Sequence, residues 1–230
     1  MKIINNINGN QTFKAKHIAT TITKAGKNEH VINLFSLDKN DQKFGYKLLE
    51  KIDLDKLYPE VENKENFISW KTLIMAAIAM IGRQNVVLAV RDKRPCGIMS
   101  YDADGEGGIN LSYLAKWRVK ASDDTYHIGK ALVHHLLSEA QNLKAEYVSL
   151  IPFGFSPRGK SSKTFYESIG FHEMENRSHM VIPDFAFQVR AAQLENFFTK
   201  TQKGDGREVD ADKNFSLNFY ETLSEKLFKN

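Results

Sequence analysis

The sequence predicts an α+β fold with a mixed, mostly antiparallel central sheet, flanked by helices and followed by extra C-terminal helices. The order of the expected elements is the first reason: strand, two helices, three strands, helix, strand, helix, two strands and further helices. The second reason is a pair of strand-like runs on either side of residues 91–95, which predicts a β-hairpin. The third is the predominantly apolar run at residues 147–151, typical of a strand at the centre of a sheet.

Size and composition are those of a globular protein. The chain has 230 residues, of which 42% are hydrophobic and 26% charged, so it can bury a sizeable core. Its net charge of +4 suits a phosphate-bearing ligand without demanding a nucleic acid. Cys96 is the only cysteine, which excludes an internal disulfide and a zinc site built on cysteines.

Neither a secretory signal nor a membrane span is expected. The first residues lead directly into polar sequence, and the longest apolar run, residues 73–81, is too short to cross a bilayer. We therefore expect a cytoplasmic protein without a membrane partner.

The first part of the chain predicts a leader, a strand and two helices. Residues 1–29 are polar and form an N-terminal leader of uncertain order, with a candidate short strand at residues 18–22. Residues 30–37 alternate as a strand does, whereas residues 44–52 and 67–81 have the apolar spacing of helices.

The central part predicts most of the sheet. The hairpin strands are residues 86–90 and 96–101, and an acidic turn follows at residues 102–108. Residues 109–119 form a third antiparallel strand, long enough to carry a bulge. The remaining elements are a helix after Gly129, a strand at 147–151, a helix at 161–169 that Gly170 ends, and strands at 171–174 and 179–182.

The last part, residues 184–230, predicts a C-terminal helical appendage. Residues 185–198 form an amphipathic helix, residues 201–213 a charged linker and residues 215–228 a final helix. The polar faces of these helices mix both signs of charge, so they suit packing or a homodimer contact better than a membrane surface.

Residues 117–137 read WRVKASDDTYHIGKALVHHLL, a strand end, a polar loop and the start of a helix. The first N–H groups of a helix have no partner within the helix, and the helix dipole places partial positive charge there. This layout predicts a phosphate-binding turn.

This segment, together with SSKTFYESIGF at residues 161–171, resembles the GNAT superfamily, the Gcn5-related N-acetyltransferases. The resemblance covers residues 30–183. It implies that acetyl-CoA binds between two splayed central strands as co-substrate. It also implies transfer of the acetyl group to a primary amine of a small molecule or peptide, by direct attack in a ternary complex.

The signature loop of that family, Arg/Gln-x-x-Gly-x-Gly/Ala, falls on residues 124–129. Asp124 stands at the Arg/Gln position and His127 at the first glycine position, whereas Gly129 keeps the pattern. The resemblance implies cofactor contacts from the main chain of the strand end, the loop and the first helical turn: Trp117, Arg118, Val119, Thr125, Tyr126, His127, Ile128, Gly129, Lys130 and Ala131.

The resemblance also implies that Tyr166 is the catalytic acid that protonates the CoA thiolate. A phenol with an ordinary pKa of about 10 is protonated at neutral pH. The residues themselves are equally compatible with a buried structural tyrosine. Gly159 stands where the family often has Asn.

The general base is not identified by the sequence. Residues 109–119 carry no carboxylate, and Asp102, Asp104 and Glu106 lie in the preceding acidic turn, where a solvated role is the simpler interpretation.

Two other classes of function are relevant to this sequence. A non-catalytic protein of the same fold, binding an acyl-CoA or a protein partner, is the alternative to the enzyme. A nucleic-acid binder would need a basic stripe with interleaved aromatic residues, which the sequence lacks, so we expect no nucleic-acid partner. The histidine spacing predicts no metal site.

Overall fold

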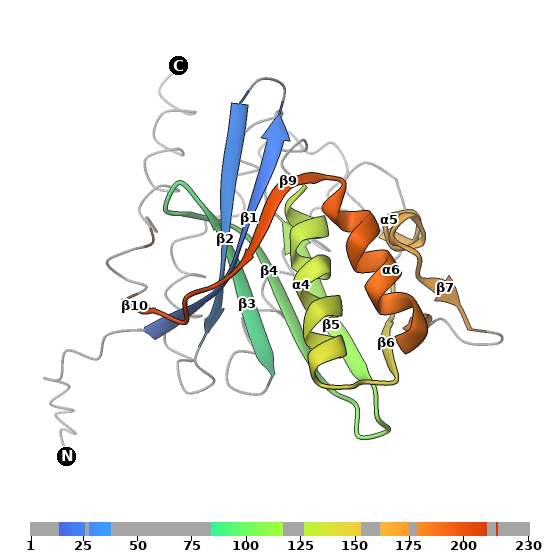
Figure 1. Ribbon diagram of the computed structural model, residues 1–230. Coiled ribbons are helices and arrows are strands. Elements are labelled where there is room, and N and C mark those ends of the chain that lie inside the picture. The colour runs from blue at the N-terminus through green and yellow to red at the C-terminus, as the bar shows by residue number, and fades with distance from the viewer. Residues whose placement is uncertain are drawn as a thin grey trace, which may run out of the picture.

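A computed structural model of the chain describes residues 14–25, 28–37, 84–116, 127–152, 162–174, 179–210 and 215. These residues form a single ten-stranded sheet accompanied by the helices α4, α5 and α6 (Figure 1). Every strand pair is antiparallel except one. The predicted α+β class with a mixed, mostly antiparallel sheet is therefore confirmed.

The strand order in the sheet is β10-β1-β2-β3-β4-β5-β6-β8-β7, and β9 pairs with β1 next to β10. The parallel pair is β5–β6. The strands are β1 (Lys14–Ala25), β2 (Asn28–Leu37), β3 (Asn85–Arg91), β4 (Arg94–Ala103), β5 (Ile109–Lys116), β6 (Tyr147–Leu150), β7 (His172–Glu173), β8 (Met180–Pro183), β9 (Phe198–Lys203) and β10 (Glu208–Asp210).

The hairpin β3–β4 confirms the prediction for residues 86–101. Its turn residues Asp92 and Lys93 both have positive φ, 51° and 62°. Two successive residues with positive φ give a turn whose twist matches that of the flanking strands.

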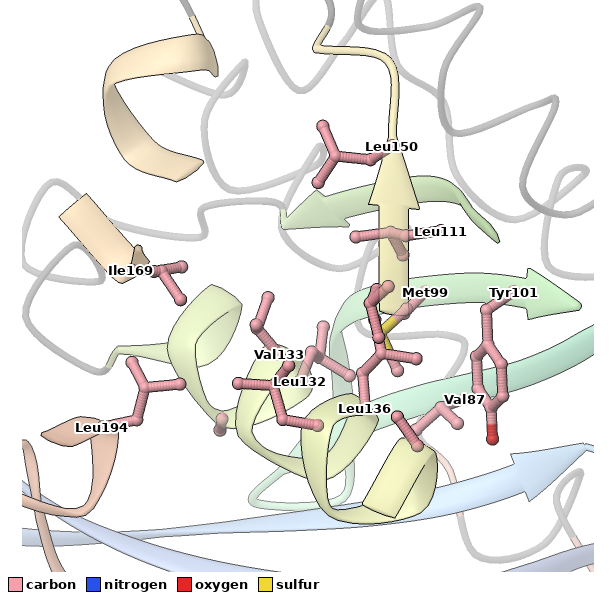
Figure 2. Packing of buried hydrophobic residues seen from close by; sticks show 14 of the residues in the cluster. Val87, Met99, Tyr101, Leu111, Leu132, Val133, Leu136, Leu150, Ile169 and Leu194 are labelled. Atoms are coloured by element: carbon pink, nitrogen blue, oxygen red, sulfur yellow. The ribbon is translucent and has the colours of Figure 1, made fainter. Parts of the chain in front are cut away.

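The helix α4 (Ile128–Asn142) connects β5 to β6, as a parallel pair requires. Figure 2 shows Leu132, Val133 and Leu136 of this helix packed against side chains of the sheet. The helix α6 (Asp184–Glu195) lies beside α4 and contributes Leu194 to the same core (Figures 1 and 2). Both helices therefore cover one face of the sheet.

Close packing at Gly97 fixes where α4 begins. A Cβ atom at this position of β4 would lie 2.7 Å from Ile128 Cγ2 and 3.2 Å from the carbonyl oxygen of Ala115. Gly97 is paired with Lys116, the last residue of β5. The N-terminal end of α4 therefore lies directly over the C-terminal end of β5.

The N-terminal part of the chain differs from the prediction. Residues 14–25 form the strand β1, which pairs with β2 on one side and with β9 and β10 on the other, so the description of this stretch as a leader with a short strand is wrong. The inward side chains of β1 are small or hydroxylated, such as Ala15, Thr21 and Thr23, and give no strong apolar alternation.

The C-terminal part also differs. The helix α6 is present but ends at Glu195, before the predicted end at residue 198. The strand β9 begins at Phe198 and runs into the predicted linker at residues 201–213, which also contains β10. The loop between these two strands, residues 204–207, is bound to β1. His17 Nδ1 lies 2.9 Å from Asp205 Oδ1, and the His17 N–H donates to the Arg207 carbonyl. The predicted helices at residues 44–52 and 67–81, and residues 216–228 of the last one, lie outside the described residues.

Within the described part of the chain, none of the helices is both long enough and apolar enough to cross a membrane.

Candidate active site

The two parallel strands separate in the middle of the sheet. They are paired at Ile109–Val148, Asn110–Ser149 and Leu111–Leu150 only. Beyond Leu150 the strand β6 ends, whereas β5 continues to Lys116. Among the described residues, no strand pairs with the side of β5 that faces β6 over residues 112–115.

A β-bulge lies where the strands separate. Ser100 is paired with Tyr113, but Tyr101 is paired with Leu111, so Ser112 has no partner on β4. Its hydroxyl oxygen instead accepts hydrogen bonds from Gln84 Nε2 at 2.8 Å and Asn110 Nδ2 at 3.2 Å. This strand, which the sequence made long enough to carry a bulge, does carry one, and the bulge redirects β5 where it leaves β6.

The N-terminal end of α4 lies at the same end of β5 and begins with three N–H groups that precede the helical ladder. No side-chain hydrogen bond caps this end within the described residues, and the first turn contains no acidic residue. The Ala131 N–H donates to the His127 carbonyl at 2.9 Å, so the donors that precede the helical ladder are those of Ile128, Gly129 and Lys130. The helix dipole adds partial positive charge, and such an end binds phosphate.

His127 precedes α4 in the left-handed conformation, with φ 56° and ψ 29°. Glycine adopts this conformation without strain, which explains physically why the related signature has glycine here. The imidazole packs edge-on against the ring of Phe197, with centroids 5.1 Å apart. Burial and the nearby Lys130 and Lys116 lower the pKa of His127, so the ring is neutral at pH 7.

Gly129 connects the two sequence segments that carry the resemblance. A Cβ atom there would lie 3.1 Å from Phe165 Cζ on α5 (Ser162–Ile169), closer than ordinary van der Waals contact. Phe165 in turn packs against Tyr166, with ring centroids 5.2 Å apart. The first turn of α4 and the FYESIGF segment are therefore direct neighbours.

Tyr166 is buried, with 8% of its surface exposed. The helix α5 ends in a Schellman motif: the Phe171 N–H donates to the Tyr166 carbonyl, the Gly170 N–H donates to Glu167, and Gly170 has φ 108°. The contact between the rings of Tyr166 and Phe171, at 5.6 Å, is the apolar contact that accompanies this motif. Packing therefore gives this tyrosine a structural role, and burial raises its pKa, which keeps the phenol protonated.

Lys130 extends from the first turn of α4 over an aromatic ring. Its Nζ lies 3.0 Å from the ring centroid of Phe197, and burial lowers its pKa. Phe197 was not among the predicted site residues, because it lies in the C-terminal part of the sequence that the resemblance does not cover. The residues next to it in the sequence form no pattern that predicts a binding site.

The structure brings together half of the predicted cofactor residues. His127, Gly129 and Lys130 surround the start of α4, whereas the side chains of Ile128 and Ala131 are buried in the core. The other five predicted contacts lie outside the described residues: Trp117, Arg118, Val119, Thr125 and Tyr126. So do Asp124 and Gly159, two positions at which the sequence departs from the family pattern.

The acidic turn lies at the other end of β5, before Ile109. At about 3.3 Å per residue, the start of β5 is roughly 20 Å from its end beside α4. Asp104 Oδ1 accepts the N–H groups of Glu106 at 2.8 Å and Gly108 at 3.0 Å. Burial alone would raise the pKa of Asp104, but these hydrogen bonds lower it, so its role in the turn is structural.

A separate concave surface of about 510 Å³ lies at the start of β6 and not at the opening that follows its end. Glu146, Tyr147, His172 and Asp184 are among its lining residues. In the described ranges, no group of three or more His, Cys, Asp or Glu side chains is arranged to hold a metal ion.

No protein-family model matches the sequence, and no curated protein matches it. Among solved structures, aminoglycoside 6′-acetyltransferase type Ii is 16% identical, with 66% of this chain and 96% of that chain covered, at a TM-score of 0.42. An acetyltransferase of the GNAT family from Staphylococcus aureus Mu50 is 11% identical, with 66% and 99% covered, at a TM-score of 0.44.

The third similar protein is AtaT, in two complexes. AtaTR bound with AcCoA is 15% identical, with 69% of this chain and 96% of that chain covered, at a TM-score of 0.42. The AtaT–AtaR complex bound to DNA is 14% identical, with 56% and 87% covered, at a TM-score of 0.39. The DNA complex overturns our expectation of no nucleic-acid partner, because it shows that a fold of this kind occurs in an assembly on DNA.

At identities of 11% to 16% these likenesses concern the fold alone. The sheet with its single parallel pair, its bulge and the helix that joins the two parallel strands has a GNAT-like architecture.

Proposed function

We propose that this protein is an N-acetyltransferase that takes acetyl-CoA as co-substrate and transfers the acetyl group to a primary amine. The observation that carries the proposal is the separation of β5 from β6 directly beside a helix N-terminus that no described side chain caps. In α/β units, ligands bind outside the carboxyl ends of parallel strands, at such a separation.

Two parts of this opening fit two parts of the co-substrate. The N–H groups of Ile128, Gly129 and Lys130 suit the pyrophosphate, with the positive charges of Lys130 and Lys116 nearby. The edge of β5 over residues 112–115, which pairs with no described strand on the side of β6, suits the amide groups of the pantetheine arm, which would add to the sheet as an extra strand. Trp117, Arg118, Val119, Thr125 and Tyr126 extend this proposed site along the chain.

Acetyl-CoA supplies an activated acyl group when bound. In our proposal the main chain of β5 orients the thioester carbonyl and donates a hydrogen bond to it. Tyr166 holds the proton that the leaving thiolate needs, and its raised pKa keeps that proton in place at neutral pH. In our proposal the amine's own proton passes to solvent.

Calorimetric titration with acetyl-CoA and CoA tests the binding claim, and thiol release across a panel of amines, polyamines, aminoglycosides and peptide N-termini tests the reaction. We expect binding of both ligands and CoA release with at least one amine. Absence of binding at millimolar acetyl-CoA would contradict the proposal. Binding without thiol release from any amine would identify a non-catalytic acyl-CoA-binding protein instead.

A further inference from the structure

Phe197 lies on the turn between α6 and β9, outside the part of the sequence that carries the resemblance. Its ring contacts both side chains that extend from the start of α4, the imidazole of His127 at 5.1 Å and the ammonium of Lys130 at 3.0 Å. Figure 1 shows this turn beside the N-terminal end of α4. The ring is 41% exposed, so it is not an ordinary core residue.

The turn that carries Phe197 is fixed from three directions. The Phe197 N–H donates to the carbonyl of Leu194, whose side chain is buried in the core. The next residue, Phe198, is paired with Thr23 of β1 and packs edge-on against His134 of α4, with centroids 5.7 Å apart. The position of the Phe197 ring relative to α4 is therefore set by the sheet and by the helix, not by its own contacts alone.

A fixed ring under Lys130 changes how its ammonium meets an anion. A lysine side chain on a helix surface samples many rotamers, and ordering it reduces the gain from any new contact. Attraction to the ring face selects one position beside the first turn of α4. The ammonium carries three N–H donors, so those directed away from the ring remain able to bind a phosphate oxygen.

We infer that Phe197 is a positioning residue for the candidate acetyl-CoA site: it holds Lys130 at the N-terminal end of α4, ready for the phosphates of the co-substrate. This inference rests on the proposed function. It assigns part of the site to the C-terminal segment that pairs with β1, which sequence analysis treated as an appendage.

The test compares acetyl-CoA binding by full-length variants in calorimetry. We expect Phe197→Leu to weaken binding about 3- to 5-fold, the range of an exposed cation–π contact, and to raise KM without lowering kcat. Phe197→Tyr keeps the ring and should bind as the unaltered protein does. Phe185→Leu, a change of the same kind at an 81% exposed position of α6, is the matched control and should have no effect.

Two further measurements separate positioning from a general structural role. In the Lys130→Met background, Phe197→Leu should cause no additional loss of affinity, because its target is gone. Acetyl-pantetheine lacks the nucleotide phosphates, so its binding should be the same with and without Phe197→Leu.

If the unaltered protein binds acetyl-CoA, any of three results would overturn the inference. The first is an unchanged affinity of Phe197→Leu for acetyl-CoA. The others are that Phe197→Leu weakens binding as much in the Lys130→Met background as in the unaltered protein, or weakens acetyl-pantetheine binding as much as acetyl-CoA binding. If the unaltered protein does not bind acetyl-CoA, the proposed function fails first and this inference fails with it.

Discussion

The two segments that carry the family resemblance touch one another, but they differ in how far packing within the protein accounts for their residues. Residues 164–171 match the family pattern more closely, and their aromatic and glycine residues are fully used in ending α5 and filling the core. Residues 127–131 match it poorly, but three N–H groups in this segment precede the helical ladder, and no described side chain caps them. The stronger sequence match is thus the one that packing explains most fully, whereas the weaker match holds the N–H groups that we propose for the phosphates.

The largest expected effect tests the structural role of residues 164–171. Phe171 is 2% exposed and packs on Tyr166, so Phe171→Ala should lower the free energy of unfolding by about 3–5 kcal/mol. Urea denaturation followed by circular dichroism measures this change. Phe185→Ala, at an exposed position, should change stability by less than about 0.5 kcal/mol. A similar small value for Phe171→Ala would show that the segment is not a packing element.

The next effect asks whether the same segment also has a catalytic role. Tyr166→Phe keeps the ring contacts and removes only the hydroxyl, so folding should change little. If the hydroxyl protonates the thiolate, kcat should fall about 100-fold or more while KM for acetyl-CoA is unchanged. An unaltered kcat would leave Tyr166 with its packing role only, and the contrast between the two segments would be complete.

A change at Gly97 tests the placement of residues 127–131. The added methyl group of Gly97→Ala would meet Ile128 Cγ2 and the backbone oxygen of Ala115, and the oxygen cannot move away easily. We expect a loss of about 1–3 kcal/mol in stability and weaker acetyl-CoA binding, because the start of α4 must shift away from β5. Binding that stays unchanged despite the lost stability would show that the ligand does not use this end of the helix.

The smallest effect concerns His127. At pH 8 its ring is neutral, and His127→Gly removes a side chain from a left-handed position where backbone and phosphate should come close. We expect acetyl-CoA binding to tighten by a factor of a few, on the order of what relief of one close contact gives. Weaker binding would mean that the imidazole itself contacts the ligand.

The pH dependence of binding sharpens this last comparison. In the free protein the pKa of His127 lies below its ordinary value, so the ring is uncharged near neutral pH. A bound phosphate favours the imidazolium, so by linkage the affinity for acetyl-CoA should rise as pH falls through the histidine range. Calorimetry between pH 8 and pH 6 should show this rise, and His127→Gly should remove it.

Much of the central sheet was predictable because local patterns encode it. The hairpin β3–β4, the strand β6 and the helices α4 and α5 each carry their own periodicity, and Gly170 marks the end of α5 by its positive φ. The start of α4 just before Gly129 followed from the same patterns. By contrast, β1, β9 and β10 are polar strands whose stability comes from ladder hydrogen bonds, so no run of apolar residues marks them.

The candidate site was less predictable than the fold because its residues are assembled from distant parts of the chain. The contact between Lys130 and Phe197 depends on the pairing of β9 with β1, whose register joins Thr20 to Gln202. Nothing in either local sequence specifies that register. The left-handed conformation of His127 also follows from the junction between loop and helix, since its residue type does not require it.

The pairing of β1 with β9 and β10 has a consequence during synthesis, before folding is complete. While the protein is being made, β1 can pair with β2 early, but its other edge stays open until residues 198–210 have been synthesised. An open strand edge is a template on which another chain can add its own strand. Premature termination or proteolysis before residue 198 would therefore turn a well-folded sheet into a nucleus for aggregation.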